Sequence, residues 1–375
     1  MPLTRLNVVT GPNGTGKSSL YRALRLLADA AGNGAVAALA REGGLASTLW
    51  AGPEHLPPST RAPKGPLQGT VRRQPVSLRL GFASEDYGYA VDFGIPRPGG
   101  SSLFSLDPEI KREVLWAGPQ FRPATLLVDR AGGHVRIRGD SGQWHDAGHF
   151  LQPYDSMLSQ FADPERAPEA LILRERVRGW RFYDYLRTDR AAPARQAQVG
   201  TRTAILAADG ADVAAALQTI REIGTHDVDT AIDQAFPGSS IAIQNTSGHF
   251  EIAFHQKGLL RPLSASELSD GTLRFLLWVA ALLSPRPPSL LVLNEPETSL
   301  HPDLLPALAR LVVTAAGDAQ VIAVTHSRAL LDALQAESRD SGIDVHAVEL
   351  AKAFGATIIE GQGTLDEPPW TWPAR

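Results

Sequence analysis

The sequence has 375 residues, a formal net charge of −4 and no cysteine. Apolar residues make up 43% and charged residues 20%, which is typical of a folded globular chain. This length suits one large domain or two smaller ones, and the net charge leaves nucleic acid only a local basic patch to bind. The absence of cysteine excludes disulfides and thiolate chemistry. The longest apolar run, residues 273–283, is too short for a membrane span, so we expect a cytoplasmic protein with no membrane partner.

In chain order, the first elements mix a strand, a helix and hairpins. The apolar run LNVVT at residues 6–10 predicts a strand, and helical spacing follows in residues 18–30. The stretch 42–75 is rich in Gly and Pro and predicts mostly loop. Alternating apolar and polar residues predict three antiparallel hairpins, at residues 75–95, 125–139 and 241–255. The residue pattern of 153–185 is typical of helices, and another helix is predicted to begin at Asp209 or Asp212.

The last third alternates regularly between apolar strands and helices. Buried strands are predicted at residues 289–297 and 320–327, with helices at residues 273–283, 303–317 and 327–337. Such alternation favours a mainly parallel sheet flanked by helices, and the hairpins add an antiparallel β subdomain. We therefore expect an α/β fold in three parts: an N-terminal lobe (1–200), an inserted helix and hairpin (200–260) and a C-terminal lobe (260–375).

A phosphate-binding motif follows the first strand. The sequence GPNGTGKS, Gly11–Ser18, fits G-x-x-x-x-G-K-[ST] between a predicted strand and a predicted helix. Glycines allow backbone N–H groups to turn toward phosphate oxygens at a helix N-terminus. Lys17 is then expected to reach the β- and γ-phosphates and the Ser18 hydroxyl to bind Mg²⁺. The alternative is a glycine turn that binds no ligand.

Polar residues follow the two buried strands of the last third. The strand LLVLN ends at Asn294 and is followed by Glu295, and VIAVT is followed by His326. In open α/β sheets nucleotides bind at the carboxyl ends of the strands, so Glu295 is placed to orient or deprotonate a water molecule. The alternatives are that Glu295 and Glu297 are loop acids and that His326 is structural.

Four motifs in this order, GPNGTGKS, LSDGT, LVLNEPETSLHP and VTHS, resemble those of the ABC ATPase superfamily. Within it the chain resembles RecF- and SMC-like ATPases, a group of AAA-type ATPases with a split nucleotide domain. The resemblance implies a P-loop fold with ATP and Mg²⁺ as cofactors. It implies that Glu295 is the catalytic base, that His326 senses the γ-phosphate and that 298–301 cross a dimer interface. The phosphate-binding residues would be Asn13, Gly14, Thr15, Gly16, Lys17, Ser18 and Ser19, with Ser18 and Asn294 near the metal.

The motif LSDGT lies far beyond the phosphate loop in sequence. By the resemblance, Ser269, Asp270 and Gly271 would contact the nucleotide of a second subunit, giving a homodimer driven by ATP. Hydroxyl and amide groups at a helix start make an anion site, which is independent support. Transporter ATPases, by contrast, keep the two motifs roughly a hundred residues apart, which makes that class the weaker alternative.

Two features depart from the family pattern. Asn294 stands where aspartate is usual, so no negative charge is supplied there and turnover is expected to be slow. This substitution supports an alternative function, a slow or non-hydrolysing nucleotide switch that regulates a partner. The glutamine that usually joins the metal shell has two candidates, Gln152 and Gln160.

The partners are the least defined part of the function. The resemblance implies DNA maintenance or repair, or anti-phage defence, with any nuclease or effector on a separate protein. An arginine-rich segment, residues 174–195, also carries Trp180, Phe182, Tyr183 and Tyr185. It could bind DNA through phosphate contacts and stacking. Alternatively, its aromatic side chains pack inward and its arginines pair with Glu175, Asp184 and Asp189.

Overall fold

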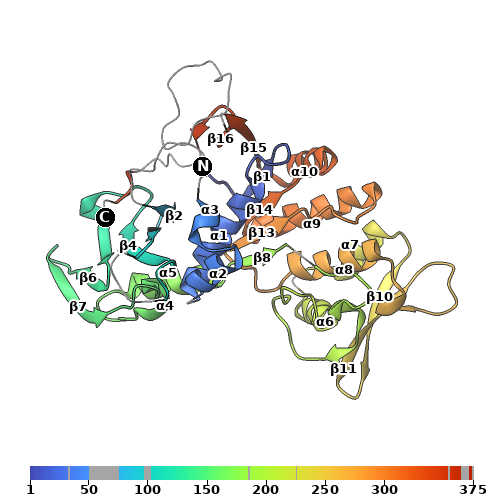
Figure 1. The fold of residues 1–375 in the computed structure, drawn as a ribbon. Coiled ribbons are helices and arrows are strands. Elements are labelled where there is room, and N and C mark those ends of the chain that lie inside the picture. Colours follow the sequence, from blue (N-terminus) through green and yellow to red (C-terminus); the bar gives the residue numbers. More distant parts are fainter. Residues whose placement is uncertain are drawn as a thin grey trace. The chain divides into compact units, whose positions relative to one another are not determined.

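The computed structural model describes residues 1–32, 34–49, 76–96, 103–184, 186–224, 226–353, 355–364 and 371–373. The chain forms two compact units (Figure 1). The first consists of Met1, Asn13–Gly179 and Leu350–Arg375, and the second of Pro2–Pro12 and Trp180–Glu349. The boundaries predicted at residues 200 and 260 both fall inside the second unit, and they remain predictions.

A parallel sheet forms the centre of the second unit. Its strand order is β15-β1-β14-β13-β8, and every neighbouring pair is parallel. The strands are β1 (Leu6–Thr10), β8 (Arg181–Tyr183), β13 (Leu290–Asn294), β14 (Gln320–Val324) and β15 (Val345–Ala353). Four consecutive residues are buried in each of β1, β13 and β14, so these strands are near-continuous apolar runs, as sheets covered on both faces require.

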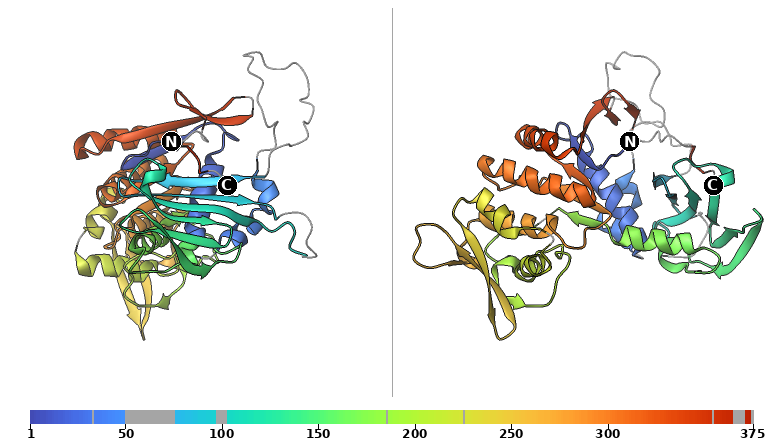
Figure 2. Two further views of the ribbon diagram at one scale, coloured as in Figure 1. Left: turned by 90° about the vertical axis from the view of Figure 1, so that its left-hand side faces the viewer. Right: turned by 180° about the vertical axis from the view of Figure 1, so that it is seen from behind.

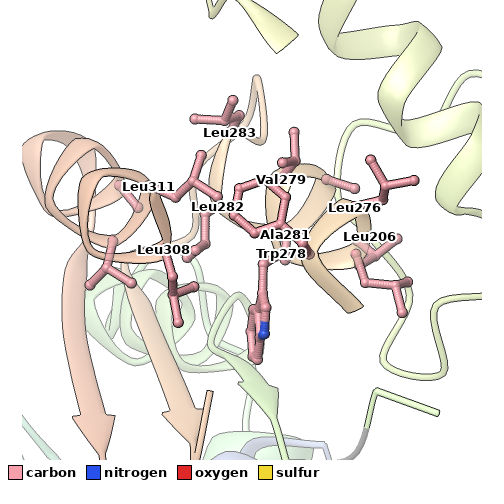
Figure 3. Close-up of a cluster of buried hydrophobic side chains, with 14 of the residues drawn as sticks. Leu206, Leu276, Trp278, Val279, Ala281, Leu282, Leu283, Leu308 and Leu311 are labelled. Carbon is pink, nitrogen blue, oxygen red and sulfur yellow. The ribbon is translucent and has the colours of Figure 1, made fainter. Parts of the chain in front are cut away.

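Helices of the second unit pack around a large apolar core. The helix α9 packs on both α8 and α10. Figure 3 shows leucines of α8 and α9 facing each other, with the Trp278 indole directed away from Leu282 and Leu283. That indole donates a hydrogen bond to the Pro296 carbonyl at 3.0 Å, which ties α8 to the loop after β13. The helices are α6 (Val213–Ile223), α7 (Val228–Ala235), α8 (Asp270–Leu282), α9 (Leu305–Asp318) and α10 (Arg328–Ser341).

A small antiparallel sheet completes the second unit. It runs β10-β11-β12, with β9 paired to β11 as well. Its strands are β9 (Gln198–Val199), β10 (Ser240–Thr246), β11 (His249–His255) and β12 (Leu263–Ser264). Three single-turn helices lie in the connections: η2 (Pro193–Arg195), η3 (Ala265–Glu267) and η4 (Pro302–Leu304).

The first unit combines a six-stranded antiparallel sheet with a helical layer. The sheet follows chain order from β2 to β7, and Figure 2 shows its strands side by side. They are β2 (Leu78–Ala83), β3 (Tyr87–Gly94), β4 (Glu109–Ala117), β5 (Leu126–Ala131), β6 (His134–Arg138) and β7 (Trp144–Phe150), with η1 (Pro123–Thr125) before β5. The helix α1 packs on α2, α4 and α5. The helices are α1 (Lys17–Ala31), α2 (Ala35–Arg41), α3 (Leu45–Thr48), α4 (Met157–Gln160) and α5 (Pro168–Arg178).

The end of the chain adds a hairpin to the first unit. Beyond Glu349, β15 pairs antiparallel with β16 (Ala356–Ile359), which pairs with β17 (Gly363–Thr364). Trp372 packs against the apolar cluster around Trp116 and Val114 in the same unit.

A fully buried ion pair lies inside the first unit. Arg130 Nη1 and Glu113 Oε2 are 2.6 Å apart, and both side chains are 0% exposed. Glu113 also accepts from the Tyr89 and Ser156 hydroxyls, and Arg130 donates to the Gln152 carbonyl. Burial, together with the neighbouring Glu113 charge, raises the pKa of Tyr89 well above its usual value. Because nearly every polar atom here has a partner, the charges contribute to structure and are not available for chemistry.

The fold expected from the sequence is confirmed, since an α/β chain with a parallel sheet and antiparallel sheets is observed. The three predicted hairpins correspond to β2–β3, β5–β6 and β10–β11. The helical prediction is wrong at residues 181–183, because these form β8 against β13. Most of the stretch 42–75 lies outside the described residues. None of the helices among the described residues is long and apolar enough to cross a membrane.

Candidate functional site

The carboxyl ends of three neighbouring strands bring polar residues to one edge of the parallel sheet. In register, Val9 of β1 pairs with Val324 of β14, which pairs with Asn294 of β13. The bonding continues past the strand ends, since Thr325 N donates to the Val9 carbonyl at 3.0 Å and Glu295 N to the Val324 carbonyl at 2.8 Å. The edge therefore holds the start of the phosphate loop together with Asn294, Glu295 and His326.

Glu295 and His326 face each other at this edge. Glu295 Oε1 lies 3.4 Å from His326 Nε2, and the two side chains are 46% and 39% exposed, so water reaches both. Glu295 has a φ of 48°, a left-handed conformation that is uncommon for residues other than glycine. Strained backbone of this kind is frequent at functional sites. A carboxylate and an imidazole in contact, both open to solvent, can accept and hold a proton from water.

Glu297 holds the histidine side of this pair in position. Its Oε1 accepts from the Thr325 hydroxyl at 2.5 Å and from the His326 backbone N–H at 3.2 Å. Its Oε2 is buried and lacks a hydrogen-bond partner. The sequence named Glu297 only in the alternative that it and Glu295 are loop acids, but its carboxylate joins the loop after β13 to residues just before α10. The sequence feature that could have pointed to this role is the position of Glu297, two residues after Glu295.

The residues Asn13–Ser19 lie in the first unit, at the start of α1. Gly14 and Gly16 have φ values of 81° and 103°, which side chains other than glycine rarely adopt. No side chain caps α1, and its first turn contains no acidic residue. Thr15 and Lys17 are buried, at 3% and 6% exposure. Ser18 and Ser19 are exposed, as are Asn13 and Gly14. A long helix without a capping carboxylate leaves its N-terminus suited to an anion.

The signature segment (residues 268–272) begins α8 in the second unit. Ser269 is the N-cap, and its Oγ accepts from the Thr272 N–H at 3.1 Å. A Cβ on Gly271 would lie 2.9 Å from the Ser299 carbonyl oxygen, so only glycine allows this close approach. Ser299 itself has a φ of 65°. Together the signature segment and the crossing loop (298–301) line an open groove of about 620 Å³, which Phe236 and 302–304 complete.

Arg195 binds the backbone that leads into the signature segment. Its guanidinium donates to the carbonyls of Thr188 (2.8 Å), Ala265 (3.0 Å) and Leu268 (2.7 Å). It also pairs with Asp270 Oδ1 at 2.6 Å, although the Asp270 side chain is 61% exposed. This pairing neutralises the carboxylate beside the helix start, where it would otherwise repel an anion. Arg195 belongs to the arginine-rich segment, for which DNA binding was one of two interpretations, but its side chain is only 8% exposed.

The turn before the signature segment is fixed by a second arginine. Glu267 accepts from Arg261 at 2.6 Å and from the Ser264 N–H at 3.0 Å, and it forms a capping box with Ser264. These hydrogen bonds, above all the one from Arg261, lower the pKa of Glu267 to about 2. The segment therefore enters α8 from a rigid turn.

Two groups of the candidate residues each lie within the second unit. Glu295 and His326 are in contact, and Ser269 and Gly271 line the same groove as Ser299 and His301. Asn294 ends β13 at the strand edge. Gln152 and Gln160, the candidates for the missing glutamine, are both exposed residues of the first unit.

The residues fit ATP and Mg²⁺ in different degrees. The left-handed glycines, uncapped helix start and buried Lys17 suit a phosphate chain. Among the described residues no group of three His, Asp or Glu side chains could hold a metal by itself. Magnesium at nucleotides is held mainly by phosphates and water with one or two protein ligands, and the exposed Ser18 hydroxyl of the first unit is a donor of that kind.

The arginine-rich segment divides between the two units. In the second unit Trp180 and Tyr183 are buried, at 9% and 2% exposure, so they cannot stack on bases. Arg187 forms two bonds of 2.8 Å to Asp189. In the first unit Arg178 donates to the Ala31 carbonyl at 2.9 Å. These contacts match the interpretation of inward aromatics and paired arginines for these residues. Tyr185 lies outside the described residues.

Solved structures similar to the chain include an Smc head bound to the C-winged helix domain of ScpA, the SMC head domain from Thermotoga maritima, and an Smc head domain with an extended coiled coil bound to the C-terminal domain of ScpA from Pyrococcus furiosus. Identities are 12%, 14% and 11%, and TM-scores 0.46, 0.39 and 0.45. Each alignment covers 96% of this chain, and 91%, 91% and 90% of the respective structures. No curated protein matches the chain.

A family model matches most of the sequence. Its description is "AAA domain, putative AbiEii toxin, Type IV TA system", and the match spans residues 6–332. That span runs from β1 into α10 and includes the phosphate loop, the signature segment, Glu295 and His326. The chain belongs to this AAA-domain family of P-loop ATPases.

Proposed function

We propose that this chain binds ATP at its phosphate loop and hydrolyses it to ADP and phosphate when two copies close around the nucleotide. In this proposal Asn13–Ser19 hold the phosphates of one copy, and Ser269, Asp270 and Gly271 of the other copy complete the site. Glu295 is the base for the attacking water, and His326 contacts the γ-phosphate.

The open groove at the signature segment is the observation that carries the proposal. Ser269 and the first amides of α8 lie at its wall, and an exposed helix start attracts an anion. Arg195 neutralises Asp270 there. Opposite them are Ser299 and His301 of the crossing loop. A groove that combines an anion-binding helix start with an exposed loop suits the phosphate chain held by a second copy.

The chemistry follows from the Glu295–His326 contact. As water attacks the γ-phosphorus in line with the leaving oxygen, Glu295 accepts its proton, and His326 stabilises the charge that develops on the phosphoryl oxygens. Ser18 and Asn294 would hold Mg²⁺, which would supply further charge stabilisation when bound. Since Asn294 adds no negative charge, metal affinity and turnover are expected to be low.

The alternative is a nucleotide switch, favoured by the same Asn294. In that case ATP closes the dimer and hydrolysis is slow or absent, so that the closed state regulates a partner. Steady-state phosphate release separates the two functions. Turnover that is lost on Glu295→Gln supports the ATPase, whereas ATP-dependent dimers without phosphate release support the switch.

The dimer is tested by light scattering with ATP and magnesium. Glu295→Gln is expected to accumulate a closed dimer, because ATP binds but water is not activated. Adding Ser269→Arg puts a bulky side chain in the groove and is expected to return the protein to monomer. Lys17→Ala is expected to weaken ATP affinity at least tenfold, about 1.4 kcal/mol, because the cation facing the phosphates is lost.

Two results would contradict the sandwich. One is a Glu295→Gln variant that stays monomeric at saturating ATP, and the other is a dimer that persists without nucleotide. Unchanged ATP affinity in folded Lys17→Ala would instead remove the phosphate-loop assignment.

For the biological role, we propose DNA maintenance or anti-phage defence with a separate nuclease or effector protein. The family description, which names a type IV toxin–antitoxin system, favours defence. Direct DNA binding is tested by filter binding at two salt concentrations with ATP and magnesium. If the arginine-rich segment contacts DNA, replacing Arg178, Arg181 and Arg187 by alanine weakens binding and flattens its salt dependence. If the wild-type chain retains no DNA on the filter, DNA is not a direct partner.

A further inference from the structure

The hairpin at the end of the chain contacts the phosphate loop inside the first unit. Thr357 of β16 donates from its Oγ1 to the Thr15 carbonyl at 2.8 Å, across a sequence separation of 342 residues. Thr15 is 3% exposed, so this bond is shielded from competing water. The contact fixes one peptide of the loop, the one that joins Thr15 to Gly16.

Gly16 makes room for this contact. A Cβ on Gly16 would lie 2.5 Å from Thr357 Oγ1 and 3.2 Å from its Cγ2. The second glycine of the G-x-x-x-x-G-K-S motif is therefore needed twice: for its φ of 103° and for the approach of the Thr357 side chain. Two independent features, a hydrogen bond and a close packing contact, thus join β16 to the loop.

A lysine extends the hydrogen-bond chain. Lys352 Nζ donates to Thr357 Oγ1 at 3.1 Å and to the Gly355 carbonyl at 2.9 Å. The Lys352 ammonium thus donates to the Thr357 hydroxyl, which donates to the Thr15 carbonyl. Each hydrogen bond in such a chain polarises the next. Withdrawal of electron density from the Thr15 carbonyl makes the N–H of the same peptide, on Gly16, a stronger donor. That N–H belongs to the loop whose amides bind phosphate.

We propose that Thr357 is a positioning residue for the phosphate loop, and that Lys352 acts through it. The pair holds the Thr15–Gly16 peptide in its anion-binding orientation and strengthens its amide donor. This inference rests on the proposed nucleotide site and adds that the C-terminal hairpin controls its affinity.

The test is ATP affinity by calorimetry on the full chain. Thr357→Val keeps the side-chain shape but removes the hydroxyl, and we expect ATP affinity to fall about fivefold, within the range of one hydrogen bond. Thr357→Ser retains the hydroxyl and is expected to keep affinity within about twofold. Thr314→Val, an exposed change on α9 in the other unit, is the matched control and is expected to leave affinity unchanged.

A double-mutant cycle separates positioning from direct binding. If Lys352 acts only through Thr357, Lys352→Met weakens affinity in the wild-type background and adds nothing in the Thr357→Val background. Equal affinity of Thr357→Val and wild type would overturn the proposal. So would a loss in Thr357→Ser as large as in Thr357→Val, or a full additive loss in the double variant. A wild-type chain that does not bind ATP is a different failure, since it removes the nucleotide site itself.

Discussion

Replacing Arg195 by methionine removes the cation beneath the signature segment while keeping an apolar side chain of similar length. Three backbone carbonyls, those of Thr188, Ala265 and Leu268, lose a charged donor at 3.0 Å or less. Each such bond contributes about 1.5 kcal/mol or more, but the three are not additive because they share one guanidinium. The pair with Asp270 adds about 0–1 kcal/mol, since that carboxylate is 61% exposed.

We therefore expect Arg195→Met to lower the free energy of unfolding of the second unit by about 3–5 kcal/mol. Urea denaturation measures this as a shift in the midpoint at unchanged slope. Arg187→Met is the matched control, because Arg187 pairs with Asp189 at the surface and its loss is expected to cost about 1 kcal/mol or less.

ATP-dependent dimerisation and ATP affinity are measured on the same variants. Arg195→Met is expected to lose ATP-dependent dimerisation in the Glu295→Gln background even where it remains folded, because the loop carbonyls reorient and Asp270 regains an unpaired charge. ATP affinity of the single chain is expected to persist. If Arg195→Met and Arg187→Met unfold at the same urea concentration and dimerise alike, Arg195 does not organise the signature segment.

Gly271→Ala places a Cβ 2.9 Å from the Ser299 carbonyl oxygen and is expected to weaken ATP-dependent dimerisation, which light scattering measures. Gly317→Ala is the control, because a Cβ there meets nothing within 4 Å, and it is expected to dimerise normally. Normal dimers in both variants would argue against a tight fit between the signature segment and the crossing loop. Glu113→Gln leaves Arg130 as a buried unpaired charge and is expected to cost about 3–5 kcal/mol of stability in the first unit. A thermal midpoint within a degree or two of the wild-type value would contradict that cost.

The elements near the motifs could be predicted because local pattern and tertiary structure agree there. β1, β13 and β14 are short apolar runs that end in polar residues, and α8 and α9 are strongly apolar helices. β15 was not predicted, because only two of its nine residues are fully buried and its sequence, VHAVELAKA, has helix-favouring composition. Its parallel pairing with β1 overrides that local preference.

The contacts that support the candidate site could not be predicted because they join segments distant in sequence. Arg195 lies 73 residues from the Leu268 carbonyl that it binds. Glu297 meets Thr325 across 28 residues, although each sits beside a motif that the sequence does identify. A sequence motif identifies the residues that are expected to contact a ligand. The residues that position them are brought close only by the fold. Asp212 illustrates the same limit: it is the N-cap of α6, but its carboxylate accepts from the Ala207 N–H.

The position of β1 in the sheet has a consequence for synthesis of the chain. Among the described strands it pairs with β14 and β15, and the Asn7 side chain donates to the Val321 carbonyl across 314 residues, so β1 leaves the ribosome long before its partners. At a translation rate of about 5–20 residues per second, these partners emerge roughly 15–60 seconds later. During that interval the apolar strand LNVVT has no native neighbour, and formation of such non-local pairs is slow. The nascent chain thus needs protection from aggregation during synthesis, and the sheet edge that carries Asn294, Glu295 and His326 is among the last parts to form.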